Sequence, residues 1–479
     1  MGTKTKYALV EDEEKQDTKN NSEDFAENTA GAIGDIEQSS DYTDDSGSTV
    51  IPDRSILHLV GINTFAFSYG LLIATFGLLT LPTESEVLWP AQHVMLLAIF
   101  LSICGVSQLS GPVAGYFSDR CTHWSGRRRP FMFWGGVIAI PSLVVLRWAS
   151  INHNLNVYMV FFTIAMLALN VMYVAYSGAL TDLVNNHQRG IANGLMGAFT
   201  VIGASAGFTC FSIFLNVQSG YYFYAAVVAF GVGSALVAFT ETPIDPSSHG
   251  PWTWREIGEC YYVSPKDHKE FYLVFVSRTL YYMGISVQAF MLFFFRDVIH
   301  YSDPQRGVSY LALCGQLTGA TVCVPMGMLS SRIGRKPLIY LSSGIIVYAY
   351  TMFMFARSLP IALMTGAIYG IGNGTYLSVD YALACDTLPC KKSAARYLGI
   401  WGVGAFIGTL IGPLLLGPTL LLFGENGNVD DRGAPSYDTI GYIAMLIVGC
   451  IFMVIGALVI IPIKSSTHQN PQEDSDSHN

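Results

Sequence analysis

Twelve apolar runs, each about 20 residues long or longer, occupy most of this chain and alternate with polar segments. An α-helix rises about 1.5 Å per residue and the hydrocarbon layer of a bilayer is about 30 Å thick, so each run is long enough to cross a membrane. We therefore predict an all-α membrane protein with twelve transmembrane helices. The first six runs are 55–81, 91–116, 130–150, 156–181, 190–216 and 221–241, and the second six are 270–295, 306–329, 337–357, 360–386, 396–423 and 437–463.

The composition favours the same class of protein. Hydrophobic residues make up 51% of the chain and charged residues only 13%, whereas soluble domains carry about 25% charged residues. The net charge of −9 comes from residues 1–53, where fourteen Asp and Glu residues outnumber four Lys residues. The acidity therefore belongs to one terminal segment and says little about a binding partner.

The polar segments divide the chain into five parts. Residues 1–53 have too few large apolar side chains to form a core, so we expect a disordered acidic tail on the cytoplasmic side. Residues 54–241 and 270–463 each hold six of the predicted helices. Between them, residues 242–269 form a polar linker, and residues 464–479 form a short polar tail.

The distribution of Lys and Arg predicts the orientation, because cytoplasmic loops of membrane proteins are enriched in these residues. With the N-terminus inside, sixteen Lys and Arg residues fall at cytoplasmic positions and five fall in outer loops. We therefore predict that both termini face the cytoplasm. Residence in the plasma membrane or in a vacuolar or endolysosomal membrane stays open at this stage.

A charged loop occurs twice between neighbouring apolar runs. The first copy, within 115–130, contains Asp119 and four arginines and separates the second and third runs. The second copy, 330–337, separates the eighth and ninth runs and has Ser331 where the first has Asp119. Two copies of one loop at equivalent positions indicate a duplicated bundle.

The ends of the fourth and tenth runs repeat in the same way. Asp182 closes the fourth run and Asp386 closes the tenth. Each aspartate is followed within about ten residues by an arginine, Arg189 or Arg396, and by a glycine-rich run. We therefore predict two pseudo-symmetric six-helix halves, a repeat pattern known from secondary transporters.

The first charged loop resembles the signature loop of the major facilitator superfamily, in which a glycine is followed by Asp-Arg and then by Gly-Arg-Arg or Gly-Arg-Lys. The matching residues are Gly115, Asp119, Arg120, Gly126, Arg127 and Arg128. The fuller string is more particularly similar to the sucrose transporters and to related glycoside–pentoside–hexuronide cation symporters. A second stretch is similar to the same group through Asp182, Gln188, Arg189, Ala192 and Asn193. The superfamily resemblance covers residues 55–463, and the sugar-symporter resemblance covers only these two stretches.

The resemblance implies a cytoplasmic gate. Asp119 would lie against the N-terminal end of the eleventh helix, where the helix dipole is positive, and the arginines would bind carboxylates of neighbouring helices. A simpler interpretation is that the arginines only enforce topology. The expected gate residues are Asp119, Arg120, Arg127, Arg128, Arg129, Asp182, Arg189, Arg335, Lys336, Asp386 and Arg396.

Two charges lie deep within predicted membrane helices, where each costs about 2.5–3.5 kcal/mol on insertion scales. Arg278 is about 12 Å from the helix start near Glu270, and Asp380 is about 9 Å from Asp386, at about 1.5 Å per residue. Each residue is the only deep charge of its helix, and the resemblance implies that helices 7 and 10 both face a central cavity, so we predict that Arg278 and Asp380 form a pair. The pair is either a coupling or substrate site or a permanent structural contact.

Polar side chains on four helices are the candidates for a solute site. The resemblance implies that helices 1, 4, 7 and 10 line a central cavity, and sugars are bound through hydrogen bonds and aromatic faces. An alternative is that many of these side chains satisfy hydrogen bonds between helices. The candidates are Asn63, Tyr69, Asn170, Tyr173, Tyr176, Tyr281, Tyr282, Gln288, Asn373 and Tyr376.

Other motifs do not support a second chemistry. Gly370-Ile371-Gly372-Asn373-Gly374 does not follow a strand of an αβ unit, so it is not a dinucleotide-binding loop; glycines there permit close helix packing. The sequence has no phosphate-binding loop with its Lys, no zinc-ligand pair and no nucleophile elbow. We expect no cofactor, no metal, no nucleic-acid partner and no enzymatic activity.

The leading hypothesis is a secondary active transporter that carries out proton-coupled symport of a sugar or glycoside by alternating access. We expect it to act as a monomer in the lipid bilayer. One alternative is an uncoupled facilitator or a carrier of another small polar solute. A second alternative, from a different class, is a membrane sensor or scaffold that has lost transport.

Overall fold

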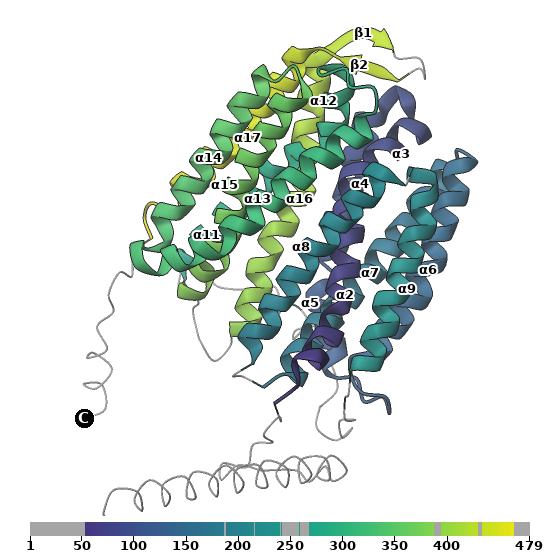
Figure 1. Cartoon of the computed structure of the whole chain (residues 1–479), viewed down its shortest axis with the longest axis vertical. Helices are drawn as coiled ribbons and strands as arrows, with labels where there is room; N and C mark the ends of the chain where they lie inside the picture. Colours follow the sequence, from purple (N-terminus) through teal and green to yellow (C-terminus); the bar gives the residue numbers. More distant parts are fainter. Residues whose placement is uncertain are drawn as a thin grey trace, which may run out of the picture. The chain divides into compact units, whose positions relative to one another are not determined.

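The structure is a computed structural model that describes residues 53–185, 188–214, 216–239, 241, 258, 268–387, 394–429 and 434–463, without the side chains of residues 181, 190, 331 and 394–396. The predictions for the acidic tail, for most of the linker and for the C-terminal tail concern residues outside this part. Within it, long helices run side by side (Figure 1).

The N-terminal half contains the first six membrane helices. Helix 1 consists of α2 (Ile56–Thr75), a π-helical turn η2 (Phe76–Thr80) and α3 (Leu81–Leu88), and helix 2 consists of η3 (Pro90–Gln92), α4 (His93–Gln108) and α5 (Gly111–Asp119). Helices 3 to 6 are α6 (Arg129–Ile151), α7 (Leu155–Leu183), α8 (Arg189–Ile213) and α9 (Val217–Ala238).

The C-terminal half repeats this order. Helix 7 consists of α11 (Lys269–Ile285), a 3₁₀ segment η5 (Ser286–Phe290) and α12 (Met291–Asp297). Helices 8 to 12 are α13 (Pro304–Ile333), α14 (Arg335–Phe355), α15 (Leu359–Asp386), α16 (Ala394–Gly424) and α17 (Thr439–Val459).

The packing of the helices shows that the two halves are equivalent. Helix 1 packs on helices 5 and 6, as helix 7 packs on helices 11 and 12. Helix 3 packs on helices 4 and 6, as helix 9 packs on helices 10 and 12. Between the halves, α4 packs on α16 and α8 packs on α13, which are equivalent contacts under a twofold exchange of the halves. The prediction of two pseudo-symmetric six-helix halves is confirmed.

Ten of the helices in the described residues are long and apolar enough to cross a membrane. Helices 7 and 10 are the two that fall short. Helix 7 is divided, so α11 has only 17 residues. The helix α15 has 28 residues, but polar side chains such as Asn373 and Asp380 lower its hydropathy. The two helices that fall short are those that carry the deep charged residues, Arg278 and Asp380.

Two side-chain hydrogen bonds to backbone carbonyls lie at the break in helix 7. The hydroxyl of Ser286 donates to the carbonyl of Tyr282 at 2.8 Å, and the hydroxyl of Tyr350 donates to the carbonyl of Gly284 at 3.0 Å. Side chains that bond helix carbonyls compete with the backbone ladder. The α-helix ends at Ile285 and resumes at Met291 after the 3₁₀ segment.

Small residues let α13 and α15 approach closely. A Cβ added to Gly374 would lie 2.3 Å from the carbonyl oxygen of Gly319, and one added to Gly370 would lie 2.2 Å from that of Gly315. The four glycines are spaced four apart on each helix, the spacing that allows close packing of membrane helices. The glycine run within 370–374 is therefore a packing surface, as the sequence predicted.

The two ends of the helices differ in composition. At one end, called the motif end, lie the two charged loops between α5 and α6 and between α13 and α14. At the other, called the hairpin end, lie α3, α12 and a two-stranded antiparallel sheet of β1 (Glu425–Val429) and β2 (Pro435–Tyr437) (Figure 1). The sequence analysis did not predict this hairpin. The predicted first helix ended at residue 81, seven residues before the end of α3.

Candidate functional site

The first charged loop is organised around Arg128, whose guanidinium is buried at the motif end. Only 5% of this residue is exposed. Its Nε donates to Asp182 at 3.0 Å, its Nη1 donates to Ser118 at 2.9 Å, and its Nη2 forms an ion pair with Asp119. Arg127 adds a second ion pair with Asp182 at 2.5 Å. One arginine thus joins α5, α6 and α7.

The backbone of this loop is held just as tightly. The N–H of Arg128 donates to the Glu241 carboxylate at 2.8 Å, and burial raises the pKa of Glu241 although hydrogen bonds from this backbone oppose the shift. Gly126 has φ +105°, and a Cβ there would lie 2.3 Å from the Glu241 carboxylate. A Cβ on Gly178 would lie 2.6 Å from Cζ of Arg128. Gly126 is favoured by its positive φ, and a side chain at position 178 would displace the Arg128 guanidinium.

The second loop reproduces this arrangement with one difference. Arg335 bonds Asp386 at 3.2 Å and Ser330 through a further hydrogen bond, as Arg128 bonds Asp182 and Ser118. Gly334 has φ +92°. The difference is the missing carboxylate at position 331, where the first loop has Asp119.

Each half also has a positively charged side chain that caps the C-terminal end of a helix. Arg129 donates to the carbonyl of Leu236 at 2.7 Å, near the end of α9. Lys336 donates to the carbonyls of Ile461 and Ile463 at 2.8 and 2.6 Å, just after α17. These cations satisfy carbonyls that have no partner within the helix, so Arg129 and Lys336 have a structural role in both halves.

The remaining expected gate residues are Arg120, Arg189 and Arg396. Arg120 lies with its guanidinium 4.4 Å from the ring centroid of Tyr116, and Arg189 begins α8 with its side chain exposed. The side chains of residues 394–396 at the start of helix 11, Arg396 among them, lie outside the described part of the chain. The ion pairs formed by Asp119, Asp182 and Asp386 in this conformation each stay within one half.

The deep pair predicted from the sequence is present in the structure. Arg278 on α11 forms an ion pair with Asp380 on α15, and the two residues are 9% and 2% exposed. The guanidinium also stacks on Trp401 of α16, with Cζ 3.5 Å from the ring centroid, and approaches Tyr282 at 4.9 Å. Three helices of the C-terminal half thus meet at this buried pair.

Most of the expected cavity residues bond or stack on one another. In the N-terminal half, Tyr176 donates to Asn63 at 2.5 Å, and Tyr69 donates to Asn170 at 3.4 Å. In the C-terminal half, Tyr281 donates to Asn373 at 2.6 Å. Tyrosine pairs also stack, Tyr69 on Tyr173 and Tyr281 on Tyr376.

These contacts favour the interhelical-packing alternative for most of that set. Eight of the ten candidates are absent from the lining of the cavity described next, namely Asn63, Tyr69, Asn170, Tyr173, Tyr176, Tyr281, Tyr282 and Tyr376. The sequence predicts which helix a residue belongs to. It does not predict which side of the helix faces the cavity, because that depends on how the helices pack.

A cavity of about 90 Å³ lies among helices of the C-terminal half, with Leu78 and Phe208 of the N-terminal half at its border. This is several times the roughly 10–15 Å³ needed for one water. None of its fifteen lining residues is charged. The lining consists of Leu78, Phe208, Val287, Gln288, Met291, Val308, Leu311, Ala312, Gly315, Gln316, Tyr350, Phe353, Gly366, Tyr369 and Asn373.

The polar lining offers hydrogen bonds from amides and one hydroxyl. Gln288 and Asn373 were predicted from the sequence, and Gln316 and Tyr369 were not. The buried hydroxyl of Tyr369 has no hydrogen-bond partner in the described part of the chain, and its ring stacks with that of Tyr350. Gln316 is the only amide side chain in the run 306–329, a signal that went unused because only helices 1, 4, 7 and 10 were considered.

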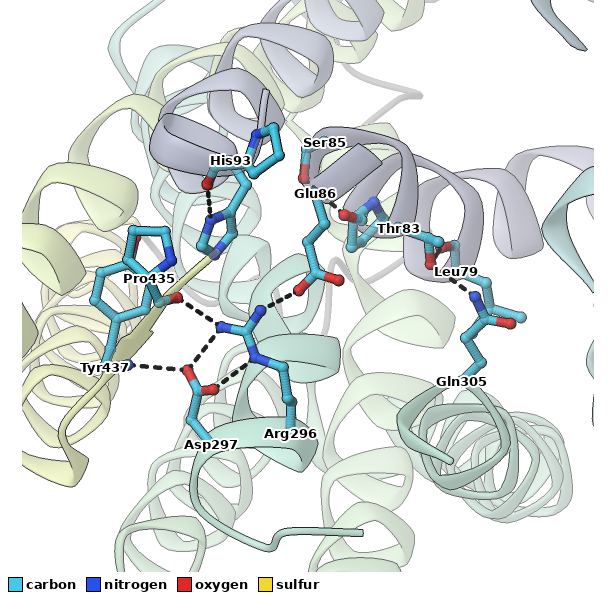
Figure 2. A network of polar contacts seen from close by, with 12 residues as sticks. Leu79, Thr83, Ser85, Glu86, His93, Arg296, Asp297, Gln305, Pro435 and Tyr437 are labelled. Atoms are coloured by element: carbon cyan, nitrogen blue, oxygen red, sulfur yellow. Dashed lines mark hydrogen bonds and ion pairs between the residues drawn. The ribbon is translucent and has the colours of Figure 1, made fainter. Parts of the chain in front are cut away.

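A polar cluster at the hairpin end joins the two halves (Figure 2). Arg296 on α12 forms an ion pair with Glu86 on α3, bonds Asp297 at 2.6 Å and donates to the carbonyl of Pro435 at 2.9 Å. Gln305 on α13 donates to Thr83 at 3.0 Å. The sequence reading did not identify this cluster. In this conformation the halves are held together at the hairpin end.

Replacing Glu86 with glutamine is expected to loosen the hairpin end. Arg296 keeps Asp297, so the loss is that of one charged hydrogen bond, about 1.5–3 kcal/mol, which corresponds to a roughly ten- to hundredfold rise in opening. The opening is measured by hydrogen–deuterium exchange of residues 81–88 and 291–297. Asp303→Asn is the matched control, because the Asp303–Arg306 pair at this end is about half exposed. Equal exchange in both variants would contradict the assignment of Glu86.

Two repeated six-helix halves with a small uncharged cavity that both halves border define a membrane transport protein. The chain belongs to the Major Facilitator Superfamily, whose family description matches residues 55–389 and 274–478.

Comparison with individual proteins agrees with this family. A relative described as "Glucuronide carrier protein homolog", from Escherichia coli strain K12, is 25% identical over 360 residues, which cover 68% of this chain and 72% of the relative. The crystal structure of the nucleoside transporter NupG is similar with a TM-score of 0.64 and 12% identity, covering 84% of this chain and 98% of that one. The human organic anion transporter MFSD10 has a TM-score of 0.58 and 13% identity, covering 84% and 98%. The two structures show the fold alone.

Proposed function

We propose that this transporter carries out proton-coupled symport of a sugar or glycoside by alternating access. Three observations support the solute class. The charged-loop string resembles that of sugar symporters, the 25% identical relative is described as a glucuronide carrier homolog, and the cavity is lined by amides, tyrosines and apolar side chains without a charge. Neutral polyhydroxy solutes are bound by such hydrogen-bonding and aromatic groups.

The buried ion pair carries the coupling proposal. Asn373, which lines the cavity, and Asp380 lie seven residues apart on α15, so the pair is about 10 Å further along the helix. A carboxylate beside a guanidinium is ionised; a proton that binds Asp380 breaks the pair and leaves Arg278 with only its aromatic neighbours. Proton binding therefore changes the contacts among α11, α15 and α16, which is what coupling to a conformational change requires.

The conformation fits one stage of an alternating-access cycle. The hairpin end is held closed by contacts between the halves, whereas the described ion pairs of the charged loops stay within each half. The excess of Lys and Arg in the loops of the motif end supports a cytoplasmic position for this end. In this proposal the described state is therefore closed toward the outside, and both termini are cytoplasmic.

Uptake by proteoliposomes tests the proposal directly. The purified chain is reconstituted, and uptake of labelled sugars and glycosides is measured with and without an inward pH gradient. Proton symport predicts accumulation that the gradient drives and a protonophore abolishes. Equilibration that ignores the gradient would support an uncoupled facilitator, and no uptake of any solute by folded protein would support a sensor or scaffold.

Asp119→Asn is expected to slow transport about two- to fivefold with little change in the solute affinity. Asp119 is half exposed, and exposed ion pairs contribute up to about 1 kcal/mol. The change is nearly isosteric, so only the charge next to Arg128 is altered. Exchange rates and binding constants of the reconstituted variant give the two quantities. A wild-type exchange rate would rule out a gating role for Asp119.

A further inference from the structure

Glu84 is a carboxylate enclosed within the N-terminal half. The residue lies on α3 and has no exposed surface. Neither carboxylate oxygen has a hydrogen-bond partner of good geometry in the described structure. Within the same described residues, no Arg, Lys or His side chain is close enough to form an ion pair with it. This distinguishes Glu84 from Glu86, which is paired with Arg296.

Hydroxyl groups from three helices surround this carboxylate. Ser150, at the end of α6, and Tyr221, on α9, lie beside it, and Tyr158 on α7 also faces it. The hydroxyls of Tyr158 and Tyr221 are 2.8 Å apart, and Ser150 accepts a hydrogen bond from Gln218 at 3.0 Å. The cluster can therefore hold a neutral carboxyl group by hydrogen bonds after small rotations of these hydroxyls, but it supplies no positive charge.

Cations on the elements that pack against α3 are engaged elsewhere. On α6, Arg147 donates to the carbonyl of Gln218 at 3.0 Å. On α12, Arg296 is held by Glu86. On α4, Nδ1 of His93 contacts the carbonyl of Pro90 at 2.9 Å, and its ring packs on the aromatic rings of α12 and β2. The turns η2 and η3 contain no ionisable side chain.

We propose that Glu84 is a proton-binding site, occupied while the hairpin end is closed. An isolated ionised carboxylate in an apolar interior is so unfavourable that the group takes up a proton instead. The neighbours lie at the ends of α6, α7 and α9 next to the hairpin-end loops, about one helical turn from the surface. Protons from that side of the membrane therefore have the shortest route to Glu84.

The site is mechanically linked to the contact between the halves. Glu84 and Glu86 are two residues apart, which is about 200° around a helix, so one faces the N-terminal half and the other faces Arg296. Loss of the proton would leave an uncompensated negative charge on Glu84, between α3 and the rest of the N-terminal half. Water would enter to solvate this charge, and α3, which carries Thr83 and Glu86, would pack less tightly. Proton binding at Glu84 therefore favours the closed hairpin end. The assignment of this step to symport rests on the proposed function; the proton site itself does not.

Infrared spectroscopy of the full chain in lipid tests the proton site without a transport assay. A protonated glutamate gives a C=O stretching band at neutral pH, and ¹³C labelling of the glutamates identifies this band because it shifts the band to lower frequency. We expect Glu84→Gln to remove this band and Glu86→Gln, the matched control, to leave it, because Glu86 is ionised beside Arg296. If Glu84→Gln does not fold, the isotope shift in the wild-type chain still reports a protonated glutamate. Its absence at neutral pH, or its persistence in folded Glu84→Gln, would overturn the proposal.

Hydrogen–deuterium exchange tests the link to the hairpin end. After correction for intrinsic exchange, opening of 81–88 is expected to rise about tenfold per pH unit over the range in which the closed form holds the proton and the open form has released it. Glu84→Gln should abolish this dependence, and Glu86→Gln should retain it. A pH-independent opening in the wild-type chain would refute the link. If opening depends on pH as expected but the protein takes up no solute, the proton site would be supported and the proposed symport would be contradicted.

Discussion

Asp380→Asn is expected to abolish uptake driven by a pH gradient while leaving solute exchange across proteoliposomes within a few-fold of wild type. Asparagine has nearly the same shape as aspartate but cannot take up the proton that would break the contact with Arg278. Exchange needs only the solute-loaded carrier to change conformation, whereas accumulation needs the proton. Uptake and exchange are measured on the same reconstituted protein. Gradient-driven accumulation by this variant would exclude Asp380 as the coupling residue.

A double-mutant cycle tests whether Arg278 and Asp380 stabilise each other. Removal of one member of a buried ion pair costs about 3–5 kcal/mol, because the other charge is left uncompensated. Arg278→Gln alone should therefore lower the yield of folded protein sharply, and combining Arg278→Gln with Asp380→Asn should restore much of it. Asp303→Asn, in an exposed pair, should have almost no effect. Strictly additive effects of the two changes would show that the residues do not interact.

Arg128→Ala is expected to have the largest effect at the motif end. The side chain is almost fully buried and joins Asp119, Asp182 and Ser118, so its loss should cost about 3–5 kcal/mol of stability. Turnover of the protein that still folds should fall at least about tenfold. Thermal unfolding in detergent and exchange in proteoliposomes provide these measurements.

The second loop provides the control for this prediction. Arg335 occupies the equivalent place but bonds one carboxylate, and the pair with Asp386 is 26% and 38% exposed. Arg335→Ala is therefore expected to cost only about 1 kcal/mol. Arg128→Lys should behave more like alanine than like the wild type, because lysine cannot bond two carboxylates in the fixed geometry of a guanidinium. Equal effects at Arg128 and Arg335 would contradict the asymmetry.

The fold was predictable because its main determinants are local in the sequence. Runs of about 20 apolar residues define membrane helices without knowledge of their neighbours, and the repeated loops and aspartates align the two halves. The division of helix 7 was not predictable in this way. One hydrogen bond at the break joins Tyr350 of helix 9 to the carbonyl of Gly284, and this contact exists only after the helices pack.

The same distinction applies to the site. Arg278 and Asp380 were recognisable because a charged side chain deep in the membrane needs a partner of opposite charge, and each of the two helices has only one such charge. Glu86 and Arg296 were missed because both occur at helix ends, where charges are common and indicate nothing specific. Tyr369 was missed because its importance depends on the helix face that lines the cavity, and that face is set by the glycines that bring α13 against α15.

The pairing of Arg278 with Asp380 has an electrical consequence. As an ion pair the two residues carry no net charge, so the membrane potential does no work on them when the carrier changes conformation without a proton. Once Asp380 binds a proton, the same region carries one positive charge. Moving one charge across the full potential is worth about 2.3 kcal/mol per 100 mV. An inside-negative voltage would therefore accelerate the inward step of the loaded carrier with a neutral solute and leave its empty return insensitive to voltage.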